Sequence, residues 1–181
     1  MIKDRDTALC IIDDSRKESF FVDATFMQLQ IQAVDDELER VVKNVTSGID
    51  IFTFNKVFIP TNVSNCHWLL IVIDIQLKSI NVYDSLSMQT KKYTDVAKNW
   101  LVREARKLDK KNFDEDEWIV NKNQGHVPKQ GKNHTECGVF TIMCADFLSD
   151  NLPLTYTLQQ MPFFRKKIAA DILRGSLTYK V

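Results

Sequence analysis

A cysteine at the start of an apolar run is the first candidate for chemistry in this sequence. Cys137 stands directly before Gly138 and an apolar run over residues 139–143 that has helical spacing. The polar residues before it are typical of turns and helix caps, so Cys137 is predicted to lie in the first turn of a buried helix. Free N–H groups and the positive end of the helix dipole stabilise a thiolate at that position. Cys137 is therefore a candidate nucleophile, although a cysteine so placed more often serves only packing.

A thiol nucleophile needs a base, and the sequence offers three histidines, His67, His126 and His134. His67 is favoured because it begins a predicted strand after a polar loop. Asp84 ends the next predicted strand, and paired antiparallel strands place the start of one beside the end of the other. His67 and Asp84 are therefore expected to be neighbours, with the carboxylate fixing the imidazole tautomer.

Gln130 is the candidate for stabilising a developing oxyanion, because its amide lies seven positions before Cys137 across a turn that can fold back. Ordinary explanations exist for each of these residues. Asp84 followed by Ser85 is also typical of a turn, and a glutamine in a loop is usually solvated. A zinc site remains an alternative, but its four potential ligands lack a tight Cys-x-x-Cys or His-x-x-x-His pair. Those ligands are His126, His134, Cys137 and Cys144.

Composition narrows the class of protein. The 181 residues suit a single globular domain, and 24 basic residues balance 24 acidic ones without a basic block, which argues against general nucleic-acid binding. The longest apolar run, 68–73, is too short to span a bilayer, and the N-terminus is too charged for a secretory signal. The four irregularly spaced cysteines indicate free thiols in a reducing compartment.

Hydrophobic periodicity predicts a mixture of helices and strands. A central β-rich region lies between helical regions, and residues 76–78 separate the two strands of a probable hairpin. Residues 20–31 are predicted to be buried and helical in their second half. Helices are predicted at 35–45, 89–108, 137–148 and from Pro162 to Gly175, and strands at 56–60 (ended by the proline), 68–75, 79–84 and 117–120.

Five short motifs occur in a characteristic order: HW at 67–68, YDS at 83–85, PKQ at 128–130, ECGVF at 136–140 and the tail QQMPFFRKKIAADIL at 159–173. As a set they resemble the ubiquitin-like protein proteases of the SUMO (sentrin) type, the Ulp/SENP family. The segment IDIFTFNKVFIP at 49–60 is similar to that family's entry into its sheet. The resemblance covers about residues 20–178. Papain-type proteases have cysteine before histidine, and adenovirus-type proteases would not explain the tail.

The resemblance implies an α+β, papain-like (adenain-like) cysteine protease fold with a central mixed sheet flanked by helices. Residues 1–181 would form one catalytic domain, with 1–19 as a divergent or shortened N-terminal segment. It implies His67 as base, Asp84 as its orienter, Cys137 as nucleophile and Gln130 as oxyanion donor. Trp68 would cover a narrow tunnel, through which only a strand without side chains, such as Gly-Gly, can pass.

The implied reaction is hydrolysis, through a thioester, of the peptide or isopeptide bond after the C-terminal Gly-Gly of SUMO. No metal or organic cofactor is implied. The expected partners are SUMO, or a related ubiquitin-like modifier, and its Lys-linked conjugates, rather than nucleic acid or membrane. The protein is expected to be monomeric and to act in the nucleus or cytoplasm.

The sequence departs from the family pattern in four places. The usual opening Trp-Leu-Asn-Asp segment is absent, and Asn44-Val45 replace an Arg-Trp pair that contacts substrate. The turn between Gln130 and Cys137 is one residue longer than usual, and Glu136 replaces an aspartate. Two alternatives therefore stay open: an isopeptidase directed at NEDD8 or ubiquitin, and a non-catalytic module that binds a modifier.

Overall fold

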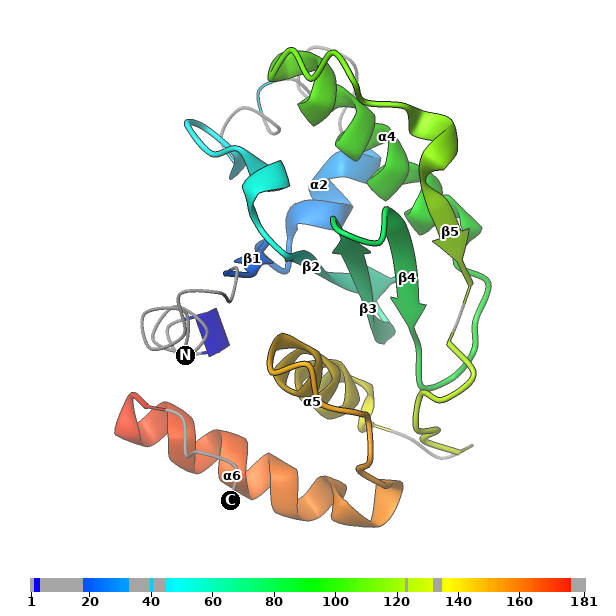
Figure 1. Cartoon of the computed structure of the whole chain (residues 1–181). Coiled ribbons are helices and arrows are strands. Elements are labelled where there is room, and N and C mark those ends of the chain that lie inside the picture. Colours follow the sequence, from blue (N-terminus) through cyan, green and yellow to red (C-terminus); the bar gives the residue numbers. More distant parts are fainter. Residues whose placement is uncertain are drawn as a thin grey trace.

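A computed structural model describes residues 2–3, 18–32, 40, 45–122, 124–131 and 135–176. It shows an α+β fold in which a five-stranded mixed sheet lies between two layers of helices (Figure 1). The strands, in sheet order, are β1 (Phe20–Phe21), β2 (Lys56–Val63), β3 (His67–Asp74), β4 (Ser79–Tyr83) and β5 (Ile119–Asn121). The helices are α2 (Phe26–Gln32), α4 (Lys91–Lys107), α5 (Cys137–Ser149) and α6 (Met161–Arg174), with short 3-10 turns η1 (Ile51–Thr53), η2 (Glu115–Glu117) and η3 (Leu158–Gln160).

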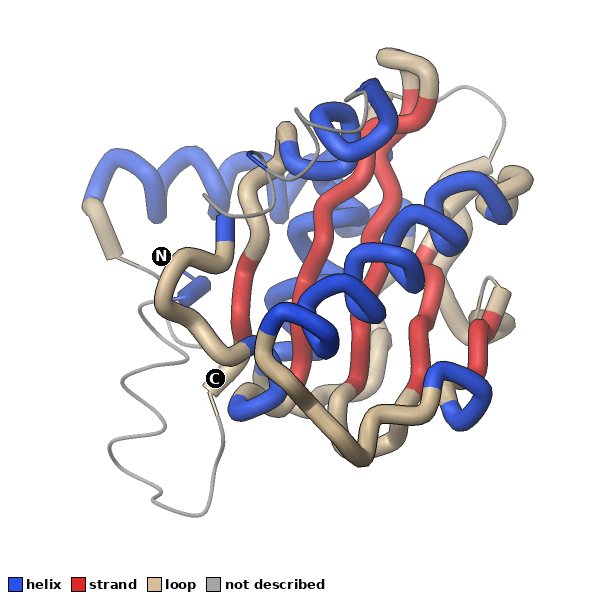
Figure 2. Tube along the Cα trace, turned by 90° about the horizontal axis from the view of Figure 1, so that it is seen from above, coloured by secondary structure: helices blue, strands red, loops and turns tan. Residues whose placement is uncertain are grey.

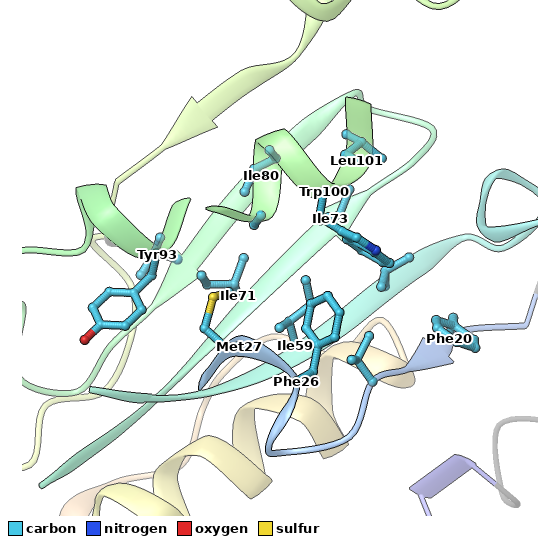
Figure 3. Close-up of a cluster of buried hydrophobic side chains, with 14 of the residues drawn as sticks. Phe20, Phe26, Met27, Ile59, Ile71, Ile73, Ile80, Tyr93, Trp100 and Leu101 are labelled. Atoms are coloured by element: carbon cyan, nitrogen blue, oxygen red, sulfur yellow. The ribbon is translucent and has the colours of Figure 1, made fainter. Parts of the chain in front are cut away.

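The long apolar run in β3 is explained by burial of both faces of the sheet. Its odd-numbered residues 69–73 belong to a core shared with α2 and α4, in which Phe26 packs edge-on against Trp100 with ring centroids 5.0 Å apart (Figure 3). Leu70 and Val72 face the opposite layer, where α5 packs on the sheet. Figure 2, seen from the α2 and α4 side, shows the strands side by side beneath the helices.

Strand register brings the predicted catalytic residues to one end of the sheet. β3 pairs antiparallel with β2 and β4, while β1 and β5 run parallel to β2 and β4 respectively. Leu70 is opposite Tyr83, so β3 begins at the end of the sheet where β4 finishes. The predicted hairpin around residues 76–78 is therefore confirmed.

The predicted end of β2 at Pro60 is wrong, because the strand continues to Val63. The hydrogen bond from Val22 N–H to Phe58 O (3.0 Å) shows that the backbone of Phe58 faces β1. Pro60, two residues on, has its nitrogen on the same side, beyond the last β1–β2 pair at Phe21 and Phe58. No ladder hydrogen bond is lost there, so the proline is tolerated.

The other predicted elements agree with the structure to within a few residues. Residues 20–31 contain β1 and then α2, and Gly175 ends α6 in a left-handed conformation with φ 68°. The strand expected at 117–120 is instead η2 followed by β5. The helix expected at 35–45 lies almost wholly outside the described residues. Within the described ranges, no helix combines the length and apolar character that crossing a bilayer requires.

The side chain of Tyr156 packs against α5 and forms hydrogen bonds with it. It is buried, its hydroxyl donates to Phe140 O (3.3 Å) and it lies 2.8 Å from Cys144 Sγ. Burial is the main cause that raises the pKa of Tyr156, so the hydroxyl stays neutral. The hydroxyl therefore links two residues of α5 to the segment that leads into α6.

We expect Tyr156→Phe to destabilise the fold by about 1–2 kcal/mol, because it leaves the buried Phe140 carbonyl and Cys144 thiol without this partner. Urea unfolding would measure the change. Tyr93→Phe is the matched control, because the Tyr93 hydroxyl has no hydrogen bond within the described residues although its ring is buried. Equal stabilities of the two variants would contradict a role for the Tyr156 hydroxyl.

Candidate active site

The expected juxtaposition of His67 and Asp84 is present. Nε2 of His67 lies 2.7 Å from Oδ1 of Asp84, and both side chains are buried, with relative exposures of 2% and 0%. His67 is the first residue of β3 and Asp84 directly follows β4. Register explains the contact, since β3 begins with His67 at the end of the sheet where β4 finishes and Asp84 follows.

A tight turn after β4 holds the Asp84 carboxylate. The backbone N–H of Leu86 donates to Oδ1 (2.8 Å) and that of Met88 donates to Oδ2 (2.6 Å). Burial alone would raise the pKa of Asp84, but the hydrogen bond from His67 and these two N–H groups outweigh it, and the pKa lies below its usual value. The carboxylate is therefore ionised and accepts only.

The ionised Asp84 carboxylate, which can only accept hydrogen bonds, determines the tautomer of His67. Because Asp84 donates no proton, Nε2 of His67 must carry the hydrogen that it shares with Oδ1. In the neutral ring, Nδ1 then has the free lone pair. His67 is thus prepared to accept a proton through Nδ1.

Cys137 is the first residue of α5, as expected, and its side chain is neither buried nor fully exposed. The N–H groups of a first helical turn have no intrahelical partner, so those at the start of α5 are available as hydrogen-bond donors. A Cβ placed on Gly138 would lie 3.9 Å from Cδ1 of Trp68. This contact places the start of α5 against the start of β3, where His67 lies.

Two further thiols in the described part of the chain differ from Cys137. Cys144 is buried in α5, and burial raises its pKa to about 12, so it stays protonated. Cys66 is exposed in the turn before His67, and its thiol donates to Val63 O at 3.4 Å. Of these three described thiols, Cys137 alone lies at the N-terminus of a helix.

A glutamine in a loop is usually solvated, but the side chain of Gln130 is buried, with a relative exposure of 1%. Hydrogen bonds connect it to the turn that carries Asp84. Its N–H donates to Ser85 O (3.2 Å) and its Oε1 accepts from Ser85 Oγ (3.1 Å). Lys129 adds two bonds, from Nζ to Asp84 O (3.1 Å) and to Ser87 Oγ (2.7 Å). The segments that carry Asp84 and Gln130 therefore form one hydrogen-bonded unit.

Arg165 of α6 holds the residue that precedes Cys137. Its Nη2 lies 2.6 Å from Oε2 of Glu136 and 3.4 Å from the carbonyl oxygen of Thr135. Glu136 is the N-cap of α5, and its carbonyl accepts the first helical hydrogen bond, from Phe140 (3.0 Å). The ion pair therefore connects α6 to the helix end that carries the thiol.

Sequence reasoning found the ionisable groups of this site but missed the residues that connect them. Ser85 stands in the YDS motif, where the sequence indicates only a turn residue. Lys129 is part of the PKQ motif and Arg165 is part of the tail, but the sequence does not indicate which residues they contact. Their partners are 29 to 45 positions away in the sequence, so spacing carries no signal for them, and only their place within the motifs hints at a role.

No group of three or more His, Cys, Asp or Glu side chains in the described ranges is arranged to hold a metal ion. His134, one ligand of the zinc alternative, lies outside these ranges. His126 instead packs edge-on against Tyr83, with ring centroids 6.2 Å apart.

Comparison with known proteins identifies the family of the chain. Residues 13–176 match the profile of the Ulp1 protease family, C-terminal catalytic domain. Human Sentrin-specific protease 2 is 30% identical over 138 residues, covering 76% of this chain and 23% of that protein. Ubiquitin-like-specific protease 1A of Arabidopsis thaliana is 34% identical over 127 residues, covering 70% and 25%.

Solved structures show the same fold. The catalytic domain of the Chaetomium thermophilum Ulp1-like SUMO protease superposes with a TM-score of 0.75 at 22% identity, over 98% of this chain and 69% of that one. The C-terminal Ulp1 protease domain in complex with Smt3, the yeast ortholog of SUMO, gives 0.70 at 21% identity, over 96% and 74%. The present chain spans about a quarter of the length of the curated relatives it matches. With a family profile that covers most of its length, the chain belongs to the Ulp1 family of cysteine proteases.

Proposed function

We propose that this chain is a catalytically competent SUMO-directed protease, which hydrolyses the peptide or isopeptide bond after the modifier's C-terminal Gly-Gly. The observation that carries the proposal is the buried His67–Asp84 hydrogen bond of 2.7 Å at the sheet end beside the start of α5. The complex of a related protease domain with Smt3 supports SUMO as the modifier.

In the first step, Nδ1 of His67 takes the proton of the Cys137 thiol, and the thiolate attacks the carbonyl carbon of the terminal glycine. The resulting imidazolium is stabilised by the Asp84 carboxylate, which is ionised and desolvated. His67 then gives the proton to the leaving amine, which is a lysine Nζ in a conjugate or the next residue's nitrogen in a precursor. A thioester on Cys137 and a free amine result.

Negative charge on the carbonyl oxygen needs donors that are already in place. The backbone N–H of Cys137 is free of helical partners, and the Gln130 amide supplies a second donor. Trp68, packed beside Gly138, covers the approach of the modifier tail. Only residues without side chains pass beneath such a ring, which explains selection of Gly-Gly.

Water completes the reaction. His67 removes a proton from a water molecule, the hydroxide attacks the thioester, and the Cys137 thiolate leaves and is reprotonated. The products are the modifier with a free C-terminal carboxylate and the regenerated enzyme. Every step uses groups of the chain and water, so the proposal requires no metal or organic cofactor.

A panel of modifier probes tests the proposal. SUMO, NEDD8 and ubiquitin, each with a C-terminal vinyl sulfone, are incubated with stoichiometric protein, and the adduct is located by peptide mass spectrometry. The expected result is a SUMO adduct on Cys137. An adduct with NEDD8 or ubiquitin instead would support the proposed catalytic mechanism but would show that SUMO is not the modifier recognised.

The panel also separates an enzyme from a non-catalytic binding module. A module would bind unmodified SUMO in a titration but would neither form an adduct nor hydrolyse a SUMO C-terminal fluorogenic amide. Absence of both adduct and hydrolysis for all three modifiers would reject the proposal.

The Arg165–Glu136 ion pair gives a smaller effect. We expect Arg165→Ala to lower kcat/KM for a SUMO substrate roughly threefold, because a partly exposed ion pair contributes about 0.2–1 kcal/mol. Raising the salt concentration should shrink the difference from wild type. Lys166→Ala, one residue along the exposed side of α6, is the matched control. If both alanine variants have the same kcat/KM, the ion pair does not position the nucleophile.

A further inference from the structure

Ser85 and Gln130 form a buried polar pair next to the proposed catalytic groups. Their exposures are 4% and 1%, and the Ser85 hydroxyl donates to Oε1 of Gln130 at 3.1 Å. A second bond, from Gln130 N–H to Ser85 O (3.2 Å), fixes the two backbones relative to each other. The backbone hydrogen bond therefore keeps the two side chains close enough to form their own hydrogen bond.

The hydrogen bond distinguishes the two ends of the Gln130 amide. A side-chain amide has one accepting end and one donating end, and rotation by half a turn exchanges them. Within the described residues, the Ser85 hydroxyl has no acceptor other than Oε1. A rotated amide would leave the hydroxyl proton buried without a partner, which disfavours that orientation.

The orientation matters because only one end of the amide can stabilise an oxyanion. The Nε2 hydrogens attract negative charge, whereas Oε1 would repel it. With Oε1 occupied by Ser85, the NH₂ end is the one left for substrate.

We propose that Ser85 is a positioning residue, which orients the Gln130 amide so that its donating end faces the oxyanion. The inference rests on the proposed function and deepens it, since it assigns a role to a residue that makes no contact with the substrate. Ser85 acts only through Gln130, so its effect must disappear when Gln130 is removed.

The test is a double-mutant cycle with a SUMO C-terminal fluorogenic substrate. Loss of an oxyanion donor typically costs about 10²–10³ in rate, so we expect Gln130→Ala to lower kcat by about 10²-fold. Ser85→Ala, which leaves the amide free to rotate, should lower kcat about tenfold with KM changed less than about twofold. In the Gln130→Ala background, the same Ser85 change should lower kcat by less than about twofold.

A second measurement separates orientation of the amide from damage to the His67–Asp84 pair. Alkylation of Cys137 by iodoacetamide forms no oxyanion, so its rate in Ser85→Ala should equal that of the wild type. Ser87→Ala is the matched control, because it removes a hydroxyl of the same turn that contacts Lys129 instead. Ser85→Thr, which keeps the hydroxyl, should restore most of the activity. If Ser85→Ala does not fold, Ser85→Cys, nearly the same shape with a weak donor, takes its place with the same expected loss.

An unchanged kcat in Ser85→Ala overturns the assignment, and so does a full tenfold loss that persists in the Gln130→Ala background or a slower alkylation. These outcomes all presuppose an active wild type. Wild-type protein that hydrolyses no modifier substrate overturns the proposed function itself, and the Ser85 role with it.

Discussion

Cys137→Ser is expected to abolish hydrolysis of a SUMO substrate, by at least about 10⁴-fold, while SUMO still binds. The change replaces one sulfur by one oxygen at a partly exposed site, so the free energy of unfolding should change by less than about 0.5 kcal/mol. A serine hydroxyl is far harder to ionise than a cysteine thiol. The imidazole of His67 can therefore remove the proton of a thiol at this position much more readily than that of a hydroxyl. Fluorogenic hydrolysis and a calorimetric titration with SUMO would measure the two properties on one sample.

Cys66→Ser provides the control for this substitution. Cys66 is exposed, directly precedes His67, and its thiol has the Val63 carbonyl as its hydrogen-bond partner among the described residues, so activity should stay within about twofold of wild type. Substantial turnover by Cys137→Ser would place the nucleophile elsewhere. Loss of SUMO binding together with a lower melting temperature would show that Cys137 serves packing instead.

The residues near the chemistry were predictable where a local rule fixes them. The hairpin around residues 76–78 and the antiparallel pairing of its two strands were enough to predict that His67 and Asp84 are neighbours, and Nε2 and Oδ1 of the two side chains lie 2.7 Å apart. The position of Cys137 at the first turn of α5 followed from turn residues before an apolar run. In both cases the deciding interactions lie within one strand pair or one helix, where sequence spacing translates directly into geometry.

The residues that connect those groups could not be predicted from spacing, because their partners lie on other elements. Ser85 meets Gln130 across 45 positions, and Arg165 meets Glu136 across 29. The predicted strand end at Pro60 was wrong for a related reason. A proline lacks a backbone N–H, and this interrupts the sheet only where a neighbouring strand would accept a hydrogen bond from it. Such facts belong to the tertiary arrangement, and a single sequence records them only through motifs such as YDS and the α6 tail.

Asp84→Asn should lower kcat by at least about 10²-fold, and the turn after β4 determines how much further it falls. Loss of the negative charge removes the stabilisation of the imidazolium. The asparagine can place its oxygen at the Oδ1 position, where Leu86 N–H and His67 Nε2–H both need an acceptor, or at the Oδ2 position, which accepts from Met88 N–H in the wild type. The first choice keeps the histidine tautomer, so we expect a smaller loss than the roughly 10⁴-fold that a wrong tautomer causes.

Either orientation of the asparagine leaves a buried backbone N–H facing an NH₂ group, so the variant should also lose about 1–3 kcal/mol of stability at pH 7. The pKa of Asp84 is lowered in the folded protein, so its contribution is present above the unfolded value of about 3.9 and is lost as pH falls through the folded pKa. The stability gap between wild type and variant should therefore narrow in acid, which urea unfolding at pH 7 and pH 3 would measure. A constant gap would mean that the charge of Asp84 does not stabilise the fold, and a near-normal kcat would remove Asp84 from the catalytic site.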